Sequence, residues 1–349
     1  MTLSDALKNG RNNNLNLLRA LAATLVIWAH AWGPTGWEPF HSVFKVGTGD
    51  VGVDVFFFLS GLLVAKSFCS HGFLEFAFAR AKRIYPALWV STTILVLVVG
   101  LFFSPLGPEF WKLPSTITYA IKNFFVLPGI GAQTDLPMAF NASTASFNTP
   151  LWTLPHEISM YALLGVVGLL GGMRKAWVPF AIMLVGIAGL IAAKFYGIEL
   201  IGGPRSRFIA LFFGGALCFV ARDRIALNGW VALVLIALMG VVVFATANEV
   251  VCQVALRCVL PYVTLWLAFV PTWPRGYNLL GDYSYGLYIL AFPVQMALYT
   301  GGVTGAWANF FATLTITLPL AALSWHGVEK RALNARLPRW LRFSMAARP

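Results

Sequence analysis

Two ionisable side chains lie within an otherwise apolar segment near the N-terminus, LLRALAATLVIWAHAWG (residues 17–33). Arg19 and His30 are eleven positions apart, close to three helical turns, so in a helix both lie on nearly the same face. At 1.5 Å per residue they are about 16 Å apart along the axis. A charge inside a membrane span is costly and marks a candidate functional site. The alternative is a snorkelling arginine and an interfacial histidine beside Trp28 and Trp32.

Two carboxylates are expected near the depth of His30. Asp54 lies about one turn inside the outer end of the second apolar segment and needs a partner there. His30 is the expected partner, because a carboxylate fixes an imidazole tautomer and stabilises its charged form; a helix cap is the alternative. Glu157 lies one turn from Tyr161, on the same face, near the outer start of the fourth segment. The alternative for Glu157 is a carboxylate favoured by the helix dipole. We therefore predict an outer cluster of His30, Asp54 and Glu157.

A basic cluster is expected at the opposite, cytoplasmic depth, near Arg19. The stretch FARAKRIYP contributes Arg80, Lys82 and Arg83. Arginine and lysine suit phosphate binding, although ordinary topology-determining charge is the alternative. A ligand with a phosphate-bearing end in the cytoplasm and a long thin arm would connect this cluster to His30, and acyl-coenzyme A has that shape.

The composition indicates a polytopic membrane protein. Of the 349 residues, 58% are hydrophobic and 11% are charged, and the mean hydropathy is +0.74. Soluble domains carry about 25% charged residues, so this chain has too few polar side chains for a water-facing surface. The net charge of +12 is better explained by cytoplasmic loops than by a nucleic-acid partner. The four cysteines form no CxxC or metal-ligand pattern, so we interpret them as packing residues and predict no metal site.

Ten apolar windows are long enough to cross a bilayer, which takes about 20 residues. They lie near residues 16–33, 51–69, 86–104, 150–170, 177–196, 206–221, 229–247, 254–270, 284–300 and 305–325. With the N-terminus in the cytoplasm, the cytoplasmic segments carry most of the arginine and lysine, as the positive-inside rule requires. The prediction is an all-α bundle of about ten transmembrane helices with both termini in the cytoplasm.

An eleventh, weaker window at 114–128 is short, ends in a proline and contains Lys122. Counting it as a span would invert the predicted orientation of every later span and loop. We therefore expect 105–149 to be one extracytoplasmic stretch, with 114–128 re-entrant or interfacial. The first apolar window is interpreted as a retained helix rather than a signal peptide, since many spans follow. We expect one membrane domain over 1–349, with a basic tail at 326–349 on the anionic cytoplasmic leaflet.

Five stretches carry a family resemblance. They are Arg19-x10-His30, GVDVFFFLSG (52–61), FARAKRIYP (78–86), PLWTLPHEISMY (150–161) and GDYSYGLYILAFPV (281–294). Together they resemble membrane acyltransferase family 3, the bacterial O-acyltransferases of surface polysaccharides. Their order and spacing are specific and extend over nearly the whole chain. The form LWTLPHEI is similar to the exopolysaccharide branch of this family.

The resemblance implies a multi-pass acyltransferase of the bacterial inner membrane. Its donor would be acyl-coenzyme A, acetyl by default, and its acceptor a hydroxyl of an exported polysaccharide or lipid-linked saccharide. His30 is similar to the family's catalytic histidine, with Arg19 its partner in the same motif. The residues Arg80, Arg83 and Glu157 match its cytoplasmic basic residues and fourth-span carboxylate.

The remaining expectations concern the acceptor and the rival functions. We expect Tyr161, His156 and Trp152 to contact the acceptor, and His30 to act as general base on its hydroxyl. An acyl-enzyme on His30 or another group is an open variant. Many relatives carry a histidine where this chain has Ala291, so that histidine cannot be required here. The main rival function is a transporter or flippase for a lipid-linked saccharide, which would move its substrate without consuming a thioester.

Overall fold

The computed structural model describes residues 1–10, 12–33, 38–126, 131–137, 139, 147–199, 201–246 and 248–335. Over these residues the chain is helical and contains no strand, and an isolated bridge joins Thr2 and Ala226. The all-α class is therefore confirmed. The predicted tail position falls largely outside the described residues, because the last 14 residues are not among them.

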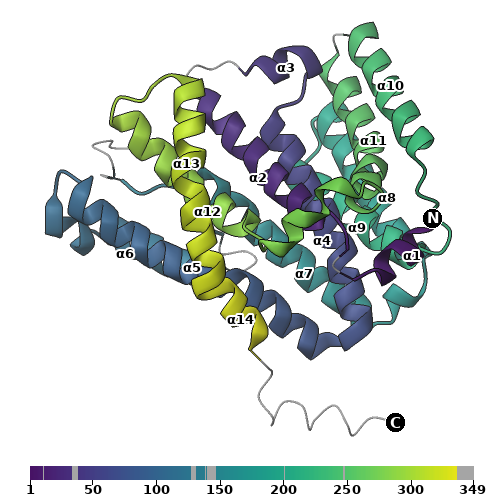
Figure 1. The fold of residues 1–349 in the computed structure, drawn as a ribbon, viewed down its shortest axis with the longest axis horizontal. Coiled ribbons are helices and arrows are strands. Elements are labelled where there is room, and N and C mark those ends of the chain that lie inside the picture. The colour runs from purple at the N-terminus through teal and green to yellow at the C-terminus, as the bar shows by residue number, and fades with distance from the viewer. Residues whose placement is uncertain are drawn as a thin grey trace, which may run out of the picture.

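The helices follow one another closely along the chain (Figure 1). They are α1 (Leu3–Lys8), α2 (Leu15–Trp32), α3 (Pro39–Phe44), α4 (Thr48–His71), α5 (Phe73–Phe102), η2 (Gly107–Lys112), α6 (Pro114–Phe124), η4 (Thr149–Thr153), α7 (Leu154–Leu169), η5 (Gly172–Arg174), α8 (Trp177–Tyr196), α9 (Gly203–Val220), α10 (Gly229–Ala245), α11 (Glu249–Phe269), η6 (Trp273–Leu279), α12 (Ser284–Thr300), α13 (Ala306–Ser324), the π-helical turn η7 (Trp325–Glu329) and α14 (Lys330–Asn334).

Six stretches of helix among the described residues are long and apolar enough to cross a membrane. They are α2, α4, α5, α8, α11 and the continuous stretch Ala306–Asn334. The other four predicted spans coincide with α7, α9, α10 and α12, which are 16 to 18 residues long. The protein is thus a multi-pass helical bundle, and the total of ten spans stays a prediction.

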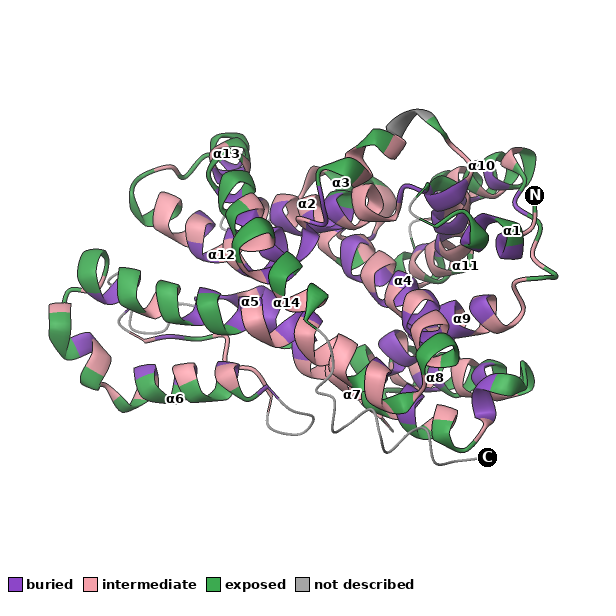
Figure 2. Cartoon of the chain, turned by 60° about the horizontal axis from the view of Figure 1, so that its bottom comes forward, coloured by how far each residue is buried: buried purple, intermediate pink, exposed green. Residues whose placement is uncertain are grey.

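The centre of the bundle is α4, which packs between α2 and α9 at unusually short distance. A Cβ atom added at Gly52 would lie 2.4 Å from the carbonyl oxygen of Ala22 in α2. One added at Gly61 would lie 1.8 Å from the carbonyl oxygen of Phe212 in α9. Small residues let helix backbones approach in this way. Gly61 is such a small residue, and Figure 2 shows buried residues along α4 and α9.

The weak window at 114–128 turns back along α5 instead of forming a long helix. Its helix α6 has 11 residues, about 16 Å, which is too short to cross the hydrocarbon core. Trp111, just before α6, donates to Val96, whereas Trp89 and Tyr85 donate to the carbonyl oxygens of Phe124 and Val126. The segment therefore runs antiparallel to α5, and α6 lies beside α5 in both views (Figures 1 and 2). This arrangement favours the re-entrant alternative; Pro128 itself lies outside the described residues.

Replacing Gly61 with alanine tests the close packing of α4 on α9. The new methyl group has to displace the α9 backbone, so we expect a loss of about 1–3 kcal/mol in stability. Gly240→Ala is the matched control, because a Cβ there meets no atom within 4 Å and alanine favours the helix. Thermal unfolding of both purified variants in detergent measures the difference. An unchanged midpoint for Gly61→Ala would contradict the packing described.

Candidate functional site

Two carboxylates and two guanidinium groups form a buried ion-pair network. Asp282 accepts hydrogen bonds from Nη1 of Arg19 at 2.6 Å and from Nη2 of Arg83 at 2.8 Å. Arg83 also pairs with Glu329 at 3.2 Å. The side chains of these residues are at most 20% exposed, and that of Glu329 is 2% exposed. The network ties α2, α5 and the start of α12 to the π-helical turn η7.

Local structure holds the two carboxylates in place. The backbone turns sharply at Gly281, whose φ of +127° favours glycine and whose missing side chain leaves room for Trp325. Asp282 then accepts from the backbone N–H and hydroxyl of Ser284, at 3.3 and 2.5 Å, where α12 begins. Burial raises the pKa of the Asp282 carboxyl, but the charges of Arg19 and Arg83 outweigh it and hold the pKa below 3.8. Asp282 is therefore ionised at neutral pH.

The network forms part of the wall of a cavity of about 560 Å³, which we call the basic cavity. Its charged and aromatic lining includes Arg19, Arg80, Arg83, Tyr161, Asp282, Trp325 and Lys330. The Nε atom of Arg80 is buried and has no hydrogen-bond partner among the described residues. Its guanidinium lies 5.8 Å from the centre of the Tyr161 ring. An unsatisfied buried donor in a cavity wall indicates a place for a ligand.

A second, smaller cavity of about 40 Å³, which we call the central cavity, adjoins the basic cavity. Arg19, Ser60 and Arg83 line both. The central cavity adds Glu157, whose carboxylate accepts a hydrogen bond from the Tyr161 hydroxyl. This pair confirms that the two side chains share one face of α7.

The position of Glu157 differs from the prediction, which put it with His30 and Asp54. The chain before α7 is held inside the bundle: Asn148 donates to the carbonyl oxygen of Ile289, and Tyr288 donates to that of Pro150. Helix α7 consequently begins against the middle of α12 rather than at its end. Glu157 therefore faces the cavity that Arg19 and Arg83 line.

His30 lies on the same face of α2 as Arg19, as the eleven-residue spacing predicts. Arg19 contacts the start of α12 at Asp282, and the His30 ring packs edge-on against Phe292, ten residues further along α12. Nδ1 of His30 lies 2.7 Å from the carbonyl oxygen of Val26. A carbonyl only accepts, so Nδ1 carries the proton and Nε2 keeps its lone pair. The described carboxylate whose charge acts on this ring is Glu38.

The predicted pair of Asp54 with His30 is not formed. The Asp54 side chain is fully buried and accepts from Nε of Arg207 at 2.5 Å and from Nε of Arg257 at 3.1 Å. Gly52, two residues earlier on α4, packs against α2. Two residues correspond to about 200° around a helix, so Asp54 faces away from α2. It anchors α4 to α9 and α11.

The other predicted site residues separate into two groups. Arg80 and Tyr161 line the basic cavity with Arg19 and Arg83, as expected for a basic cluster. Lys82 instead donates to the carbonyl oxygens of Leu333 and Ala335 and closes the end of α14.

His156 of α7 and Trp152 of η4 lie away from Glu157, against α9. Both rings pack on Phe208 of α9, with centroids 5.4 and 5.6 Å away. His156 also lines an open cavity with Glu199 and Arg205, between α8 and α9. The three residues expected to contact an acceptor are thus not brought together, because Tyr161 lies in the basic cavity.

Four charged residues that pair with the predicted site residues were not predicted from the sequence: Asp282, Glu329, Arg207 and Arg257. Two of them carried a readable signal. Arg257 lies inside the predicted span 254–270, where an ionisable group needs a partner. Asp282 precedes the span 284–300 at the depth of Arg19 and has the opposite charge. Arg207 lies only one residue inside the predicted span 206–221, at its end, and Glu329 follows the last predicted span, so neither stood out as a buried charge.

Comparison with known proteins assigns the chain to a family. Residues 12–326 match the model of family 3 of the acyltransferases, described as an acyltransferase domain. The chain belongs to this family. It is 26% identical over 338 residues to the O-acetyl transferase of Shigella phage Sf6, covering 94% of this chain and 98% of that protein. It is 27% identical over 365 residues to nodulation protein 10 of Rhizobium leguminosarum bv. viciae, covering 94% and 95%. The comparison with solved structures gave no significant match.

Family membership confirms the resemblance seen in the motifs, and it shows that the protein is an acyltransferase. The matched region contains Arg19, Arg83 and Asp282 of the ion-pair network, whereas Glu329 lies beyond it. In this membrane O-acyltransferase the matched helices α2, α5 and α7 line both cavities, and η7 and α14, mostly beyond the match, complete the basic cavity.

Replacing Asp282 with asparagine tests the ion-pair network. The change leaves two buried guanidinium groups with too few counter-charges, so we expect a loss of about 3–5 kcal/mol in stability. The control is Glu109→Gln, which removes a pair with Lys112 that is 66% and 72% exposed and costs at most about 1 kcal/mol. Thermal unfolding followed by tryptophan fluorescence compares the two. Equal small shifts would show that the network does not stabilise the bundle.

Proposed function

We propose that this acyltransferase moves an acetyl group from acetyl-coenzyme A, bound from the cytoplasm, to a hydroxyl of an exported saccharide. The observation that carries the proposal is the basic cavity, which holds the unpaired Arg80 and continues into the central cavity. A wide charged entrance leading to a narrow interior suits a donor with a phosphate-bearing head and a thin thioester arm.

The donor's phosphates would be bound mainly by Arg80 and Lys330. Arg19 and Arg83 are already paired with Asp282, and Arg83 also with Glu329, so much of their charge is neutralised. Lys330 is exposed, and its side chain has no hydrogen bond or ion pair to a described residue. In this arrangement Arg19 and Arg83 form the narrow passage rather than the primary phosphate site.

The thioester would pass Ser60 and enter the central cavity. Tyr288 lines that cavity, and Phe292, one turn further along α12, contacts the His30 ring. This continuity along α12 supports delivery of the acyl carbon toward His30.

His30 would act as the general base. Its Nε2 lone pair, left free by the Nδ1–H bond to Val26, takes the proton of the acceptor hydroxyl. The oxygen attacks the thioester carbonyl, the carbon–sulfur bond breaks, and the coenzyme A thiolate leaves and is protonated to the thiol. The Val26 carbonyl, in place of the predicted Asp54, would orient the ring.

The acceptor would approach from the end of the bundle that carries His156 and Trp152. The cavity beside His156 also presents Glu199 and Arg205, polar groups of the kind that bind sugar hydroxyls. The relative from phage Sf6 is an O-acetyl transferase, which supports acetyl as the transferred group. We propose the bacterial inner membrane as the location, with both termini in the cytoplasm.

Replacing His30 with alanine tests the base. Purified protein is incubated with acetyl-coenzyme A and a panel of candidate glycans, and coenzyme A thiol release is measured. Loss of the base lowers the rate at least about 100-fold. The control is His71→Ala, because exposed His71 makes the same contact with the carbonyl four residues earlier, that of Ser67. Retained activity in His30→Ala would overturn the mechanism; saccharide movement without thiol release would instead favour the transporter alternative.

Replacing Arg80 with glutamine tests the donor site. Loss of one charge-assisted contact raises the KM for acetyl-coenzyme A about tenfold or more, whereas the KM for the acceptor stays unchanged. Arg174→Gln is the control, because Arg174 is also predicted to face the cytoplasm but is exposed and lies outside the basic cavity. Initial rates over a matrix of donor and acceptor concentrations separate the two constants. An equal rise in both would argue against a donor role for Arg80.

A further inference from the structure

A further cavity, of about 260 Å³, lies between α8 and α11 with α9 as its floor, and we call it the lipid groove. Its walls are almost entirely apolar, and they include Met183 and Ile187 of α8, Leu211 of α9 and Val254 of α11. It is separate from the basic and central cavities and shares no lining residue with them.

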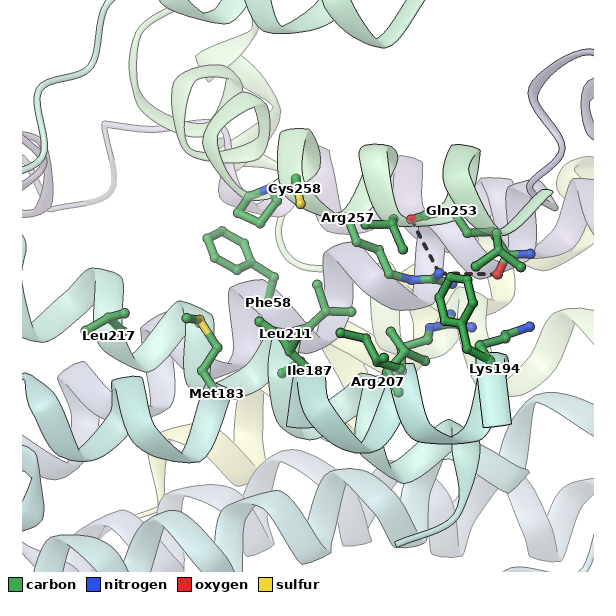
Figure 3. A pocket seen from close by; sticks show the side chains of 18 of the residues that line it. Phe58, Met183, Ile187, Lys194, Arg207, Leu211, Leu217, Gln253, Arg257 and Cys258 are labelled. Atoms are coloured by element: carbon green, nitrogen blue, oxygen red, sulfur yellow. Dashed lines mark hydrogen bonds between the residues drawn. The ribbon is translucent and has the colours of Figure 1, made fainter. Parts of the chain in front are cut away.

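The polar side chains of the groove gather at one end (Figure 3). Lys194, Arg207, Arg257 and Gln253 lie there, whereas Met183 and Leu217 lie at the other end. That polar end is also where Asp50 pairs with Arg207. In the predicted orientation it belongs to the extracytoplasmic leaflet, because α4 begins beside it.

The cations at this end exceed the carboxylates that neutralise them. Arg207 is fully engaged, with Asp50 and Asp54. Arg257 uses Nε for Asp54 and Nη1 for Gln253, and its Nη2 has no partner among the described residues. The side chain of the exposed Lys194 likewise has no hydrogen bond or ion pair to any residue that the structure describes. Three positive charges thus face two negative ones.

The apolar part has the length of one leaflet. Along α8 the lining runs from Met183 to Phe195, a separation of twelve positions or about 18 Å. The hydrocarbon core of a bilayer is about 30 Å thick, so the groove is about as long as one acyl layer. An apolar channel of this length that ends at Lys194 and at Nη2 of Arg257 is complementary to a chain that ends in an anionic group.

We propose that this groove binds an anionic, phosphate-bearing lipid. Its hydrocarbon chain would lie along α8 and α11, and its phosphate would contact Lys194 and Nη2 of Arg257. An annular lipid would need only the apolar walls, whereas the excess of positive charge requires a negative head group. A bulk phospholipid and a lipid-linked saccharide share this chemistry. The proposal does not depend on acyl transfer, because it concerns binding at a separate cavity.

The test measures lipid binding to the purified, delipidated full-length protein by native mass spectrometry. Dioleoyl phosphatidylglycerol, dioleoyl phosphatidylcholine and a polyprenyl phosphate are titrated separately. We expect the protein to bind one of the two anionic lipids, or both, more tightly than phosphatidylcholine. Tighter binding of phosphatidylglycerol identifies a bulk phospholipid as the natural ligand, and tighter binding of polyprenyl phosphate identifies a lipid-linked saccharide.

Two variants locate the site. Lys194→Gln removes the exposed cation and is expected to raise the Kd of the anionic lipids about fivefold, without effect on phosphatidylcholine. Gly214→Leu fills the floor of the groove, where an added Cβ meets only Met183, and is expected to raise the Kd more than tenfold. Lys122→Gln, an exposed lysine on α6, is the control.

Three results would overturn the proposal. They are equal affinity for phosphatidylcholine and both anionic lipids, unchanged anionic-lipid affinity in Lys194→Gln, and an equal loss of affinity in Lys122→Gln. Coenzyme A thiol release is measured on the same samples, so that loss of lipid binding and loss of acyl transfer are recorded independently.

Discussion

The arrangement of this bundle depends on neutralising charge where water is scarce. Arg19 and Arg83 come from different helices, and each would be destabilising alone in an apolar interior. Asp282 lies between them and pairs with both, and Glu329 adds a second counter-charge to Arg83. Because the four residues belong to α2, α5, the start of α12 and η7, this one network fixes the relative positions of the elements around both cavities.

Close helix packing gives the network its geometry and keeps the other charges apart. Gly52 and Gly61 let α4 lie against α2 and α9, and Asp54 faces away from α2. Asp54 is then satisfied by Arg207 and Arg257 rather than by His30. The bundle therefore contains two separate ionic centres, one beside the basic cavity and one at the polar end of the lipid groove.

The sequence predicted the helical class, the shared face of Arg19 and His30, and the meeting of Arg80 and Arg83 with Arg19, because these follow from helix periodicity and depth. It misplaced Glu157 because periodicity within α7 does not reveal where α7 begins. That depth is set by Asn148 and Tyr288, whose hydrogen bonds hold the preceding chain inside the bundle. Contacts between distant segments of this kind decide the site, and composition does not encode them.

The unequal pairing of the arginines separates structural from ligand-binding roles. A buried guanidinium with a carboxylate partner is satisfied and holds helices together, as Arg83 does. Arg80, three residues earlier, lies one turn away on the same helix yet has a buried nitrogen with no partner among the described residues. Such a group is tolerated only if something else satisfies it, since an unmet buried donor costs about 1–3 kcal/mol. In the function proposed above, the donor's phosphate would satisfy this group, and donor affinity would then depend more directly on Arg80 than on the motif residue Arg19.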